Sequence, residues 1–409
     1  MVLTYKNRLQ LLATYTLYEI LLFKKIKSMK TILLINTLIF AVNINAQIVN
    51  IPDNNFKNYL LGLPLNSNND GEIQVSEASA FNGAINCGGR NIFNLTGIEA
   101  FTSITYLNCT ANPLTSLDVS QNTALTELYC VQNQLTSLDI SKNTALTVLE
   151  CSYNQLMSLD VSKNTALSGL DCRNNQLTSL DVSQNTALFY LDCGANPLTS
   201  LDVSQNTALA YLGCYTNQLT SLGVSQNTAL SGLDCSNNQL TSLVVSQNTA
   251  LTVLECSNNQ LTSLDVSQNT ALTELYCVQN QLTSLDVSQN TALTDLYCSV
   301  NLLQCLNVKN GNNSNLAAFD ALYNTSLNCI EVDDAAWSTS NWMNRVDSGT
   351  SFSTNCGNSC KVGLEELSTF PKQLVKMIDL MGRETVFKTN TPIIFLYLDG
   401  TTERVFKFE

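Results

Sequence analysis

The chain contains no histidine, so acid–base catalysis or metal binding would depend mainly on its carboxylates and thiols. It has 33 acidic residues against 20 basic ones, and 15 cysteines. The lack of histidine removes the commonest general base and the commonest metal ligand. The net charge of −13 argues against nucleic acid as a partner, since phosphate binding needs a basic surface. The kinds of site that such a composition allows are a thiol array, paired carboxylates, a calcium site and a binding surface.

Most of the cysteines form one regular series. Ten are 21 residues apart and another precedes them by 22: Cys87, Cys109, Cys130, Cys151, Cys172, Cys193, Cys214, Cys235, Cys256, Cys277 and Cys298. They could be a metal or redox array, or a column of small buried hydrophobes. Parallel Cβ directions on in-register strands disfavour disulfides. Buried thiols also have raised pKa values and are unreactive, so we expect a structural column.

The segment Asn66 to Glu77, NSNNDGEIQVSE, has the spacing of a calcium-binding loop. It resembles the EF-hand loop, with a glycine at the sixth position and a glutamate at the twelfth. Asparagine replaces the usual aspartate at the first position, so we expect an affinity of ~10⁻⁴–10⁻³ M. The alternative is a polar turn between two cap helices. The expected calcium ligands are Asn66, Asn68, Asp70, the carbonyl of Glu72, and Glu77.

The cysteine spacing belongs to a repeat, exemplified by Leu125 to Ala145 (LTELYCVQNQLTSLDISKNTA). The pattern LxxLxCxxNxLxxLDVSxNxx resembles the leucine-rich repeat, with cysteine in the third apolar position. The resemblance is to the short 21-residue class of exported bacterial proteins. Alternating apolar residues predict a short strand in each unit. One unit cannot bury its own apolar face, so successive units must stack into a parallel sheet.

The predicted fold is a β-rich solenoid, a flat and right-handed leucine-rich-repeat coil with a parallel sheet. We expect a small helical N-terminal cap at 47–82, repeats at 83–305, a C-terminal cap at 306–360, and a small C-terminal β tail. Because the two halves of each unit mirror one another, extended structure is expected on both sides of every coil. Asn133 and its equivalents should satisfy backbone groups of their own and the next coil. Asp53 should cap a helix over residues 51–63.

Three positions around each cysteine vary between units, whereas the half LTSLDVSQNTAL barely changes. Alternation places all three variable columns outward on one sheet. They carry tyrosines and carboxylates among glycines and serines, which is typical of a recognition surface. The alternative is drift wherever packing imposes no restraint. The expected ligand-binding residues are Tyr190, Tyr211, Tyr215, Asp171, Asp192 and Asp234.

The N-terminus is typical of an exported protein. Residues 29–46 have a charged start, an apolar run from Thr31 to Val42 and a small residue, Ala46, before the expected cleavage at Gln47. Residues 1–28 fit no part of a signal peptide, and we interpret them as an extension from a start codon assigned too early. The alternative, a two-segment membrane anchor, is disfavoured because neither apolar run reaches the ~20 residues needed to span a bilayer.

The end of the chain, residues 365–409, is β-rich. Its stretch Asp379 to Arg383 (DLMGR), the YxDG ending at Gly400 and the short basic-apolar terminus resemble the C-terminal sorting domain of the type IX secretion system. That resemblance implies a Bacteroidetes-type surface protein, translocation across the outer membrane and removal of the tail, often with attachment to surface lipopolysaccharide. The alternative is a small stabilising β-domain. One or two disulfides are expected, with the pairing undetermined, among Cys305, Cys329, Cys356 and Cys360.

The expected function is that of an exported, non-catalytic binding or adhesion protein, secreted or displayed on the outer-membrane surface. It would recognise an extracellular protein or glycan through the variable sheet, meet the type IX machinery through its tail, and carry no transmembrane span when mature. One alternative is a passive, calcium-associated structural protein. Another is a carboxylate-based hydrolase, which would need a cleft and one carboxyl with a raised pKa.

Overall fold

The computed structural model describes residues 47–357 and 360, residues 24, 25 and 27, and the backbone of 374–378, 393–397 and 402–405. The expected signal peptide at 29–46 and most of the sorting-type tail at 365–409 lie outside the described residues. Within the described part, no helix is long and apolar enough to cross a membrane.

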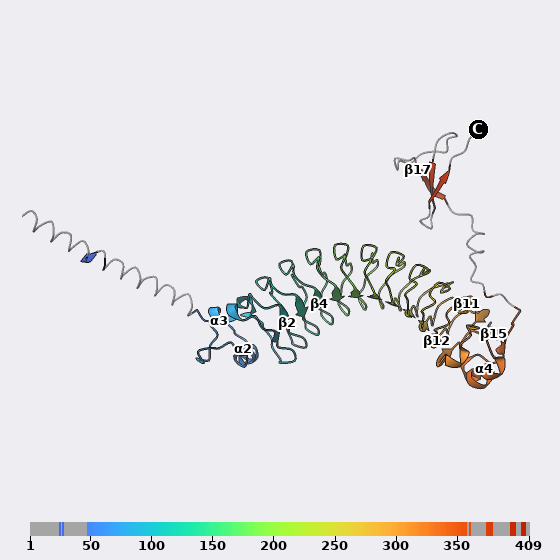
Figure 1. The fold of residues 1–409 in the computed structure, drawn as a ribbon, viewed down its shortest axis with the longest axis horizontal. Helices are drawn as coiled ribbons and strands as arrows, with labels where there is room; N and C mark the ends of the chain where they lie inside the picture. The colour runs from blue at the N-terminus through green and yellow to red at the C-terminus, as the bar shows by residue number, and fades with distance from the viewer. Residues whose placement is uncertain are drawn as a thin grey trace, which may run out of the picture.

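The repeats stack into a curved solenoid (Figure 1). The cysteine-side segments pair into a parallel sheet of 12 strands, which confirms the predicted parallel-sheet solenoid, although the stack is an arc and not flat (Figure 1). Each strand pairs in register with the equivalent residues of the next coil, for example Tyr190 with Tyr211. In sheet order the strands are β1 (Ile85–Asn86), β2 (Tyr106–Asn108), β3 (Glu127–Tyr129), β4 (Val148–Glu150), β5 (Gly169–Asp171), β6 (Tyr190–Asp192), β7 (Tyr211–Gly213), β8 (Gly232–Asp234), β9 (Val253–Glu255), β10 (Glu274–Tyr276), β12 (Asp295–Tyr297) and β14 (Ala318–Asp320).

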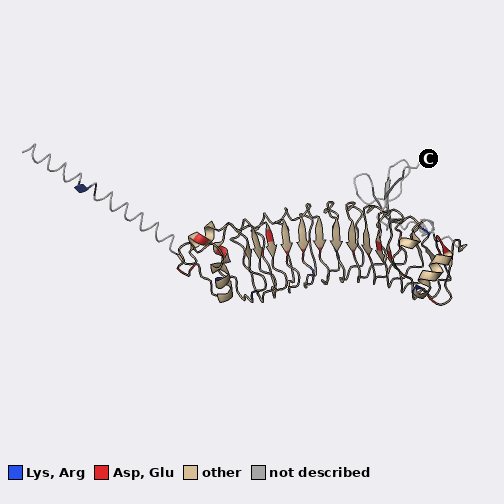
Figure 2. Cartoon of the chain, turned by 60° about the horizontal axis from the view of Figure 1, so that its bottom comes forward, with Lys and Arg blue, Asp and Glu red and all other residues tan. Residues whose placement is uncertain are grey.

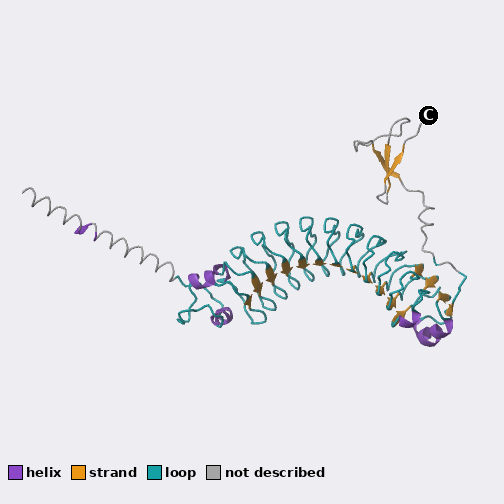
Figure 3. Cartoon of the chain, in the orientation of Figure 1, coloured by secondary structure: helices purple, strands orange, loops and turns teal. Residues whose placement is uncertain are grey.

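The sheet lies on the inner side of the arc, and helices are confined to the two ends (Figure 3). The strands run side by side in one direction (Figure 2). In β6 the central Leu191 and the following Cys193 are both fully buried, while Tyr190 faces away from the core. This alternation repeats in each coil, so one apolar core runs along the solenoid.

Extended structure was expected on both sides of every coil, but paired strands run along the whole solenoid only on the cysteine side. On the conserved half, strands form only toward the C-terminal end, as a second parallel sheet in the order β11 (Ser284–Asp286), β13 (Cys305–Asn307), β15 (Cys329–Glu331) and β16 (Ser351–Ser353). The outer side of an arc is longer than its inner side, which makes the close backbone spacing of a ladder harder to maintain there. Side-chain amides bridge the coils instead. Asn143 Nδ2 donates to the carbonyls of Val119 and Asn122, each at 2.9 Å.

Asn133 and its equivalents on the cysteine side bond to backbone groups of two coils, as predicted. Asn133 Nδ2 donates to the Cys130 carbonyl of its own coil and to the Cys109 carbonyl, each at 3.1 Å. Asn133 Oδ1 accepts from Leu114 N at 3.1 Å. The neighbour it satisfies is therefore the preceding coil and not the following one. Because this side chain uses both donor and acceptor groups, it fixes the spacing between coils.

Helices close the two ends of the core. At the N-terminal end, α2 (Asn54–Leu61) begins at the predicted cap Asp53, whose side chain accepts from Asn55 N and Phe56 N. It is followed by α3 (Val75–Ala80) and the short η1 (Ile98–Ala100). At the C-terminal end, Trp342 of α4 (Ala335–Trp342) stacks on Phe319 with ring centroids 4.4 Å apart. The short helices η2 (Asn313–Asn315) and η3 (Met343–Arg345) complete that cap.

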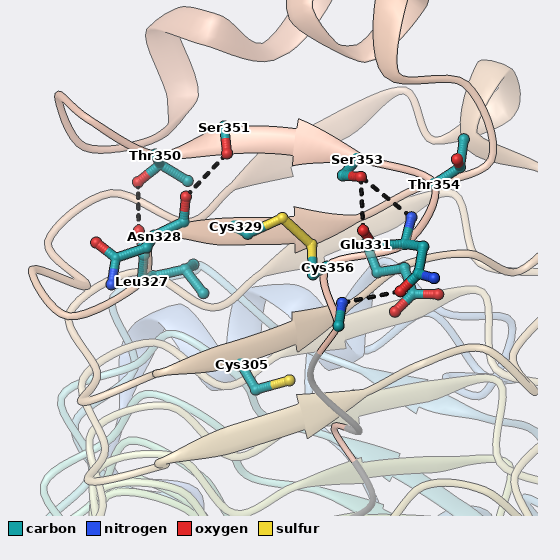
Figure 4. Close-up of a disulfide and its surroundings, with 12 residues drawn as sticks. Cys305, Leu327, Asn328, Cys329, Glu331, Thr350, Ser351, Ser353, Thr354 and Cys356 are labelled. Carbon is teal, nitrogen blue, oxygen red and sulfur yellow. Dashed lines mark hydrogen bonds between the residues drawn. A yellow bond between two sulfur atoms is a disulfide. The ribbon is translucent and has the colours of Figure 1, made fainter.

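The four off-register cysteines form two disulfides, Cys305–Cys360 and Cys329–Cys356. Figure 4 shows the second one, which joins β15 to the segment after β16. In the tail, β17 (Leu374–Ile378), β18 (Ile393–Tyr397) and β19 (Thr402–Val405) form a separate antiparallel sheet.

Candidate functional site

The inner face of the solenoid is defined here by the side chains that point away from the core in β2 to β10 and β12, together with the residue after each cysteine. Arg173 is its single basic residue. The inner face carries eight carboxylates, Glu127, Glu150, Asp171, Asp192, Asp234, Glu255, Glu274 and Asp295. It also carries seven tyrosines, Tyr106, Tyr129, Tyr190, Tyr211, Tyr215, Tyr276 and Tyr297.

Six of the tyrosines form three pairs between adjacent strands. Ring centroids are 5.3 Å apart for Tyr106 with Tyr129, 5.0 Å for Tyr190 with Tyr211, and 5.2 Å for Tyr276 with Tyr297. Successive pairs are separated by two strands, β4 and β5 and then β8 and β9. Those intervening strands all end in a carboxylate. Along the solenoid, bands of tyrosines therefore alternate with bands of carboxylates on the inner face. The central band is defined by Tyr190, Tyr211, Tyr215 and Asp192.

Glycines make room for the central band. A Cβ at Gly194 would lie 2.5 Å from the Tyr215 ring, and one at Gly213 would lie 2.9 Å from Asp192 Oδ1. Tyr215 therefore lies across Gly194, and the Asp192 carboxylate lies over Gly213. The structure thus brings four of the six predicted binding residues, Tyr190, Tyr211, Tyr215 and Asp192, together in two consecutive coils.

The predicted roles of Asp171 and Asp192 need correction. We expected them to offer polar contacts around the tyrosines, but these residues are only 7% and 1% exposed. Both carboxylates hold Arg173, whose Nη1 lies 3.1 Å from Asp192 Oδ2 and whose Nε lies 3.4 Å from Asp171 Oδ2. They point away from the core, as alternation predicts, yet neighbouring side chains cover them. Both carboxylates therefore hold Arg173 in place by ion pairing.

Burial changes the acid–base properties of this cluster. It raises the pKa of Asp192 to about 6, with a further contribution from the Asp171 charge, while the Gly194 N–H and Arg173 oppose the shift. Burial, together with the charge of Asp192, likewise raises the pKa of Tyr190 to about 12. A hydrolase would need such a raised carboxyl pKa, but it would also need substrate to reach the group. At 1% exposure Asp192 offers no such access.

Asp234, the sixth predicted residue, lies on β8 beyond the central tyrosines. Its Oδ1 accepts from Ser236 N at 3.0 Å and from Ser236 Oγ at 2.7 Å, and burial raises its pKa. Burial and the charge of a neighbouring carboxylate raise the pKa of Glu150 and of Glu255 as well. The acidic bands are thus partly dehydrated, which strengthens their attraction for positive charge.

Phe189 was missed by the sequence analysis and lies at the edge of the central band, directly before Tyr190 in the chain. It directly precedes β6 and is 61% exposed. Most coils have threonine or serine at this position, such as Thr126, whose Oγ1 donates to the Thr105 carbonyl at 3.1 Å. Phe189 cannot make that bond, so it gives up a contact between coils and exposes an aromatic ring. Comparison of this column between the repeats would have revealed it.

The loop from Asn66 to Glu77 is closed by hydrogen bonds within the protein. Glu77 Oε1 accepts from Ser67 N at 2.7 Å, and Asp70 Oδ2 accepts from Asn68 Nδ2 at 2.9 Å. The Glu72 side chain pairs with Lys57 at 2.7 Å, which leaves only its carbonyl for an ion. Asn66 Oδ1, the first predicted ligand, is buried without a hydrogen-bond partner among the described residues. The oxygen-rich donor set suits calcium by type.

The 11 cysteines of the repeats are free and buried. Burial raises the pKa of Cys130 to about 12 and that of Cys172 well above its usual value. Across the described ranges, no group of three or more acidic or cysteine side chains is arranged to hold a metal ion. The cysteine column is therefore a packing feature of the core.

The outer half of each coil is the nearly invariant segment LTSLDVSQNTAL. Its repeated aspartates have a local structural role. Asp181 Oδ1 accepts from Ser183 N at 2.9 Å, and the same bond recurs at Asp118, Asp139, Asp160 and Asp202. These bonds to the serine hold the pKa of each carboxyl below its ordinary value. The aspartate column thus stabilises one turn per coil.

No protein-family model and no curated protein sequence matches this chain. Among solved structures, it is similar to the functional domain of InlJ from Listeria monocytogenes, which includes a cysteine ladder. The two are 29% identical with a TM-score of 0.52, over 83% of this chain and 93% of that one. An internalin, InlF, from Listeria monocytogenes is 21% identical with a TM-score of 0.57, over 73% of this chain and 95% of that one.

A third similar structure is the leucine-rich-repeat ectodomain of the plant receptor kinase GASSHO1/SCHENGEN3 from Arabidopsis thaliana, solved in complex with CASPARIAN STRIP INTEGRITY FACTOR 2. It is 22% identical with a TM-score of 0.50, over 57% of this chain and 31% of that one. The chain is therefore a leucine-rich-repeat solenoid with 21-residue repeats, similar in fold to bacterial leucine-rich-repeat proteins.

Proposed function

We propose that this protein is an exported binding or adhesion protein that recognises an extracellular protein or glycan through its inner face. The observation that carries the proposal is the concentration of seven tyrosines and eight carboxylates on that face. The outer half repeats nearly the same sequence in every coil. Only the inner face therefore has enough variety to distinguish one partner from another.

The central band is the part of the face best suited to contribute affinity. Tyr190, Tyr211, Tyr215 and Phe189 lie in two consecutive coils, and Phe189 is largely exposed. Binding energy concentrates in a few aromatic anchors near the centre of an interface. A tyrosine adds a polar tip to a large apolar contact area. An aromatic ring exposed at the cost of a hydrogen bond between coils is accounted for by such a role.

Export to the cell surface or to the medium is supported by the C-terminal cap. Its two disulfides are of the kind that forms in oxidising compartments outside the cytoplasm. The signal-like segment at 29–46 and the sorting-type tail at 365–409 point the same way. We propose that the type IX secretion machinery recognises that tail, which is then removed.

Calcium at the N-terminal cap is a second part of the proposal. Side chains of Asn66, Asn68, Asp70 and Glu77, with the carbonyl of Glu72, would hold the ion. The orphaned Oδ1 of Asn66 supports this assignment, since a buried acceptor without a partner is costly. The ion would offset the repulsion between Asp70 and Glu77 and brace the cap against the first coil.

Protein and glycan arrays probed with the full chain test the binding proposal. A variant carrying Phe189→Thr and Tyr215→Ser is probed in parallel. These substitutions restore residues that other coils have at the same positions, such as Thr126 and Ser236, so the fold should be unchanged. We expect a partner that the wild type binds and the variant binds at least tenfold more weakly. Equal binding by both chains would contradict the proposal.

A further inference from the structure

An open slot lies beside the central tyrosines, above Gly169 of β5. A Cβ at Gly169 would meet only the methyl groups of Val148, at 3.9 and 4.0 Å. At Gly232, on the other side of the tyrosine pair, a Cβ would lie 3.0 Å from Tyr211 Cδ2. The pair therefore leans toward Gly232, and the Tyr190 ring face next to Gly169 is left uncovered.

The walls of this slot carry negative charge that the protein does not fully balance. Asp171 lies two residues after Gly169 on the same strand, and Glu150 pairs with Asp171 in the sheet register. Arg173 holds Asp171 and Asp192. Among the described residues, no donor is bonded to the carboxylate of Glu150. The charge of Arg173 acts on Glu150 as well, but it is shared among three carboxylates, so the slot keeps an excess of negative charge for a second cation.

We propose that the inner face binds an extended, arginine- or lysine-rich polypeptide segment, with one cationic side chain seated over Gly169 between the Tyr190 ring and Glu150. This inference rests on the proposed binding function and specifies the class of partner. A flat guanidinium group fits an aromatic face with a carboxylate beside it. The chain itself contains a guanidinium group over a tyrosine ring, because Arg90 Cζ lies 4.6 Å from the centroid of the Tyr59 ring.

The banding of the inner face favours an extended basic segment over a sugar. The stacked tyrosines cover one another's facing sides, with an interplanar angle of 11° for Tyr190 and Tyr211, so only one side of each ring remains for sugar stacking. The face carries eight carboxylates against one arginine, which is complementary to a basic partner. Acidic strands recur on either side of the central pair, at β4 and β5 and at β8 and β9. A segment lying along the solenoid would meet both.

The test measures binding of an acetylated, amidated decaarginine peptide to the full chain and to four variants. Gly169→Val fills the slot with the side chain that the preceding coil already has at Val148. Gly223→Val is its matched control on the outer half, where Val244 occupies the equivalent position and a Cβ meets nothing within 4 Å. Glu150→Gln and Asp181→Asn each remove one negative charge, from the inner face and the outer half respectively.

We expect Gly169→Val and Glu150→Gln to raise the dissociation constant at least tenfold, with Gly223→Val and Asp181→Asn within twofold of wild type. If all four variants had the same dissociation constant for decaarginine, binding would reflect general charge attraction, and the proposed seat over Gly169 would be wrong. If wild type did not bind decaarginine, the proposal of a basic partner would be wrong. If the neutral sugar cellohexaose instead bound in a Tyr190-dependent way, the partner class would be wrong while the proposed function would stand.

Discussion

Asp192 combines a buried position with an ionisable group, which makes the stability of the solenoid depend on pH. Burial raises its folded-state pKa to about 6 from an ordinary value of 3.8. A carboxyl group with a raised folded pKa stabilises the protein fully below its unfolded pKa, and that contribution is lost as the pH rises through the folded pKa. The relevant window therefore runs from about pH 4 to just above pH 6.

We expect wild type to lose up to about 3 kcal/mol of unfolding free energy relative to Asp192→Asn between pH 4 and pH 7.5. The difference is measured by urea denaturation of both proteins at the two pH values. Asp181→Asn is the control, because hydrogen bonds from Ser183 lower the pKa of Asp181 and its dependence has the opposite sign. A pH-independent difference between wild type and Asp192→Asn would contradict this account of the cluster.

A second feature at this scale is the left-handed backbone that follows the cysteine-side strand in each repeat. Val300 has a φ of 57°, where a β-branched residue is strained, and its equivalents Asn174 and Asn237 have φ values of 53° and 54°. Asparagine tolerates this conformation better than other non-glycine residues.

Val300→Asn should therefore raise the unfolding free energy by about 1 kcal/mol, and the reverse change Asn174→Val should lower it by about as much. Val300 is 42% exposed, so little apolar burial is lost. Chemical denaturation of both variants checks the pair. If they shift stability in the same direction, strain at this position is not the cause.

The loop of the N-terminal cap can be tested for calcium binding by itself. Glu77 would supply the bidentate ligand of the calcium loop, and in the structure its carboxylate also accepts from Ser67 and Gln74. Glu77→Gln keeps an acceptor for Ser67 but removes bidentate coordination. Calorimetric titration of the full chain should show one site with an affinity of ~10⁻⁴–10⁻³ M, and the variant should lose it. If wild type released no heat at millimolar calcium, the calcium site would be wrong and residues 66–77 would be a hydrogen-bonded turn only.

The 21-residue period was sufficient to predict the cysteine-side strands, their register and the outward columns. Those features follow from alternation and stacking alone. The period says nothing about how far a side chain reaches between coils. The pairing of Arg173 with Asp192 and the burial of both aspartates were therefore missed. The loss of strands on the outer half depends on curvature, which is a property of the whole stack. Disulfide pairing depends on how the C-terminal cap folds over β13 and β15.

The prediction of export rests on the two ends of the chain. The mature protein should begin near Gln47 and lack the segment after about Leu364, because the signal-like and sorting-type segments are expected to be removed. N-terminal sequencing and the intact mass of protein from its native host check both ends. A cytoplasmic product that retains Glu409 would contradict the proposed route.

The solenoid has a variable inner face and a nearly invariant outer half, and the proposed function assigns binding to the inner face. The most direct measurement compares the affinity of an array-identified partner for two double variants of the full chain. Tyr190→Ala with Tyr211→Ala changes the inner face, and Asp181→Asn with Asp202→Asn changes the outer half. Both sets of side chains point away from the core, so both variants should fold. We predict at least tenfold weaker binding for the tyrosine pair and unchanged binding for the aspartate pair. The reverse result would place the binding site on the outer half and contradict the account.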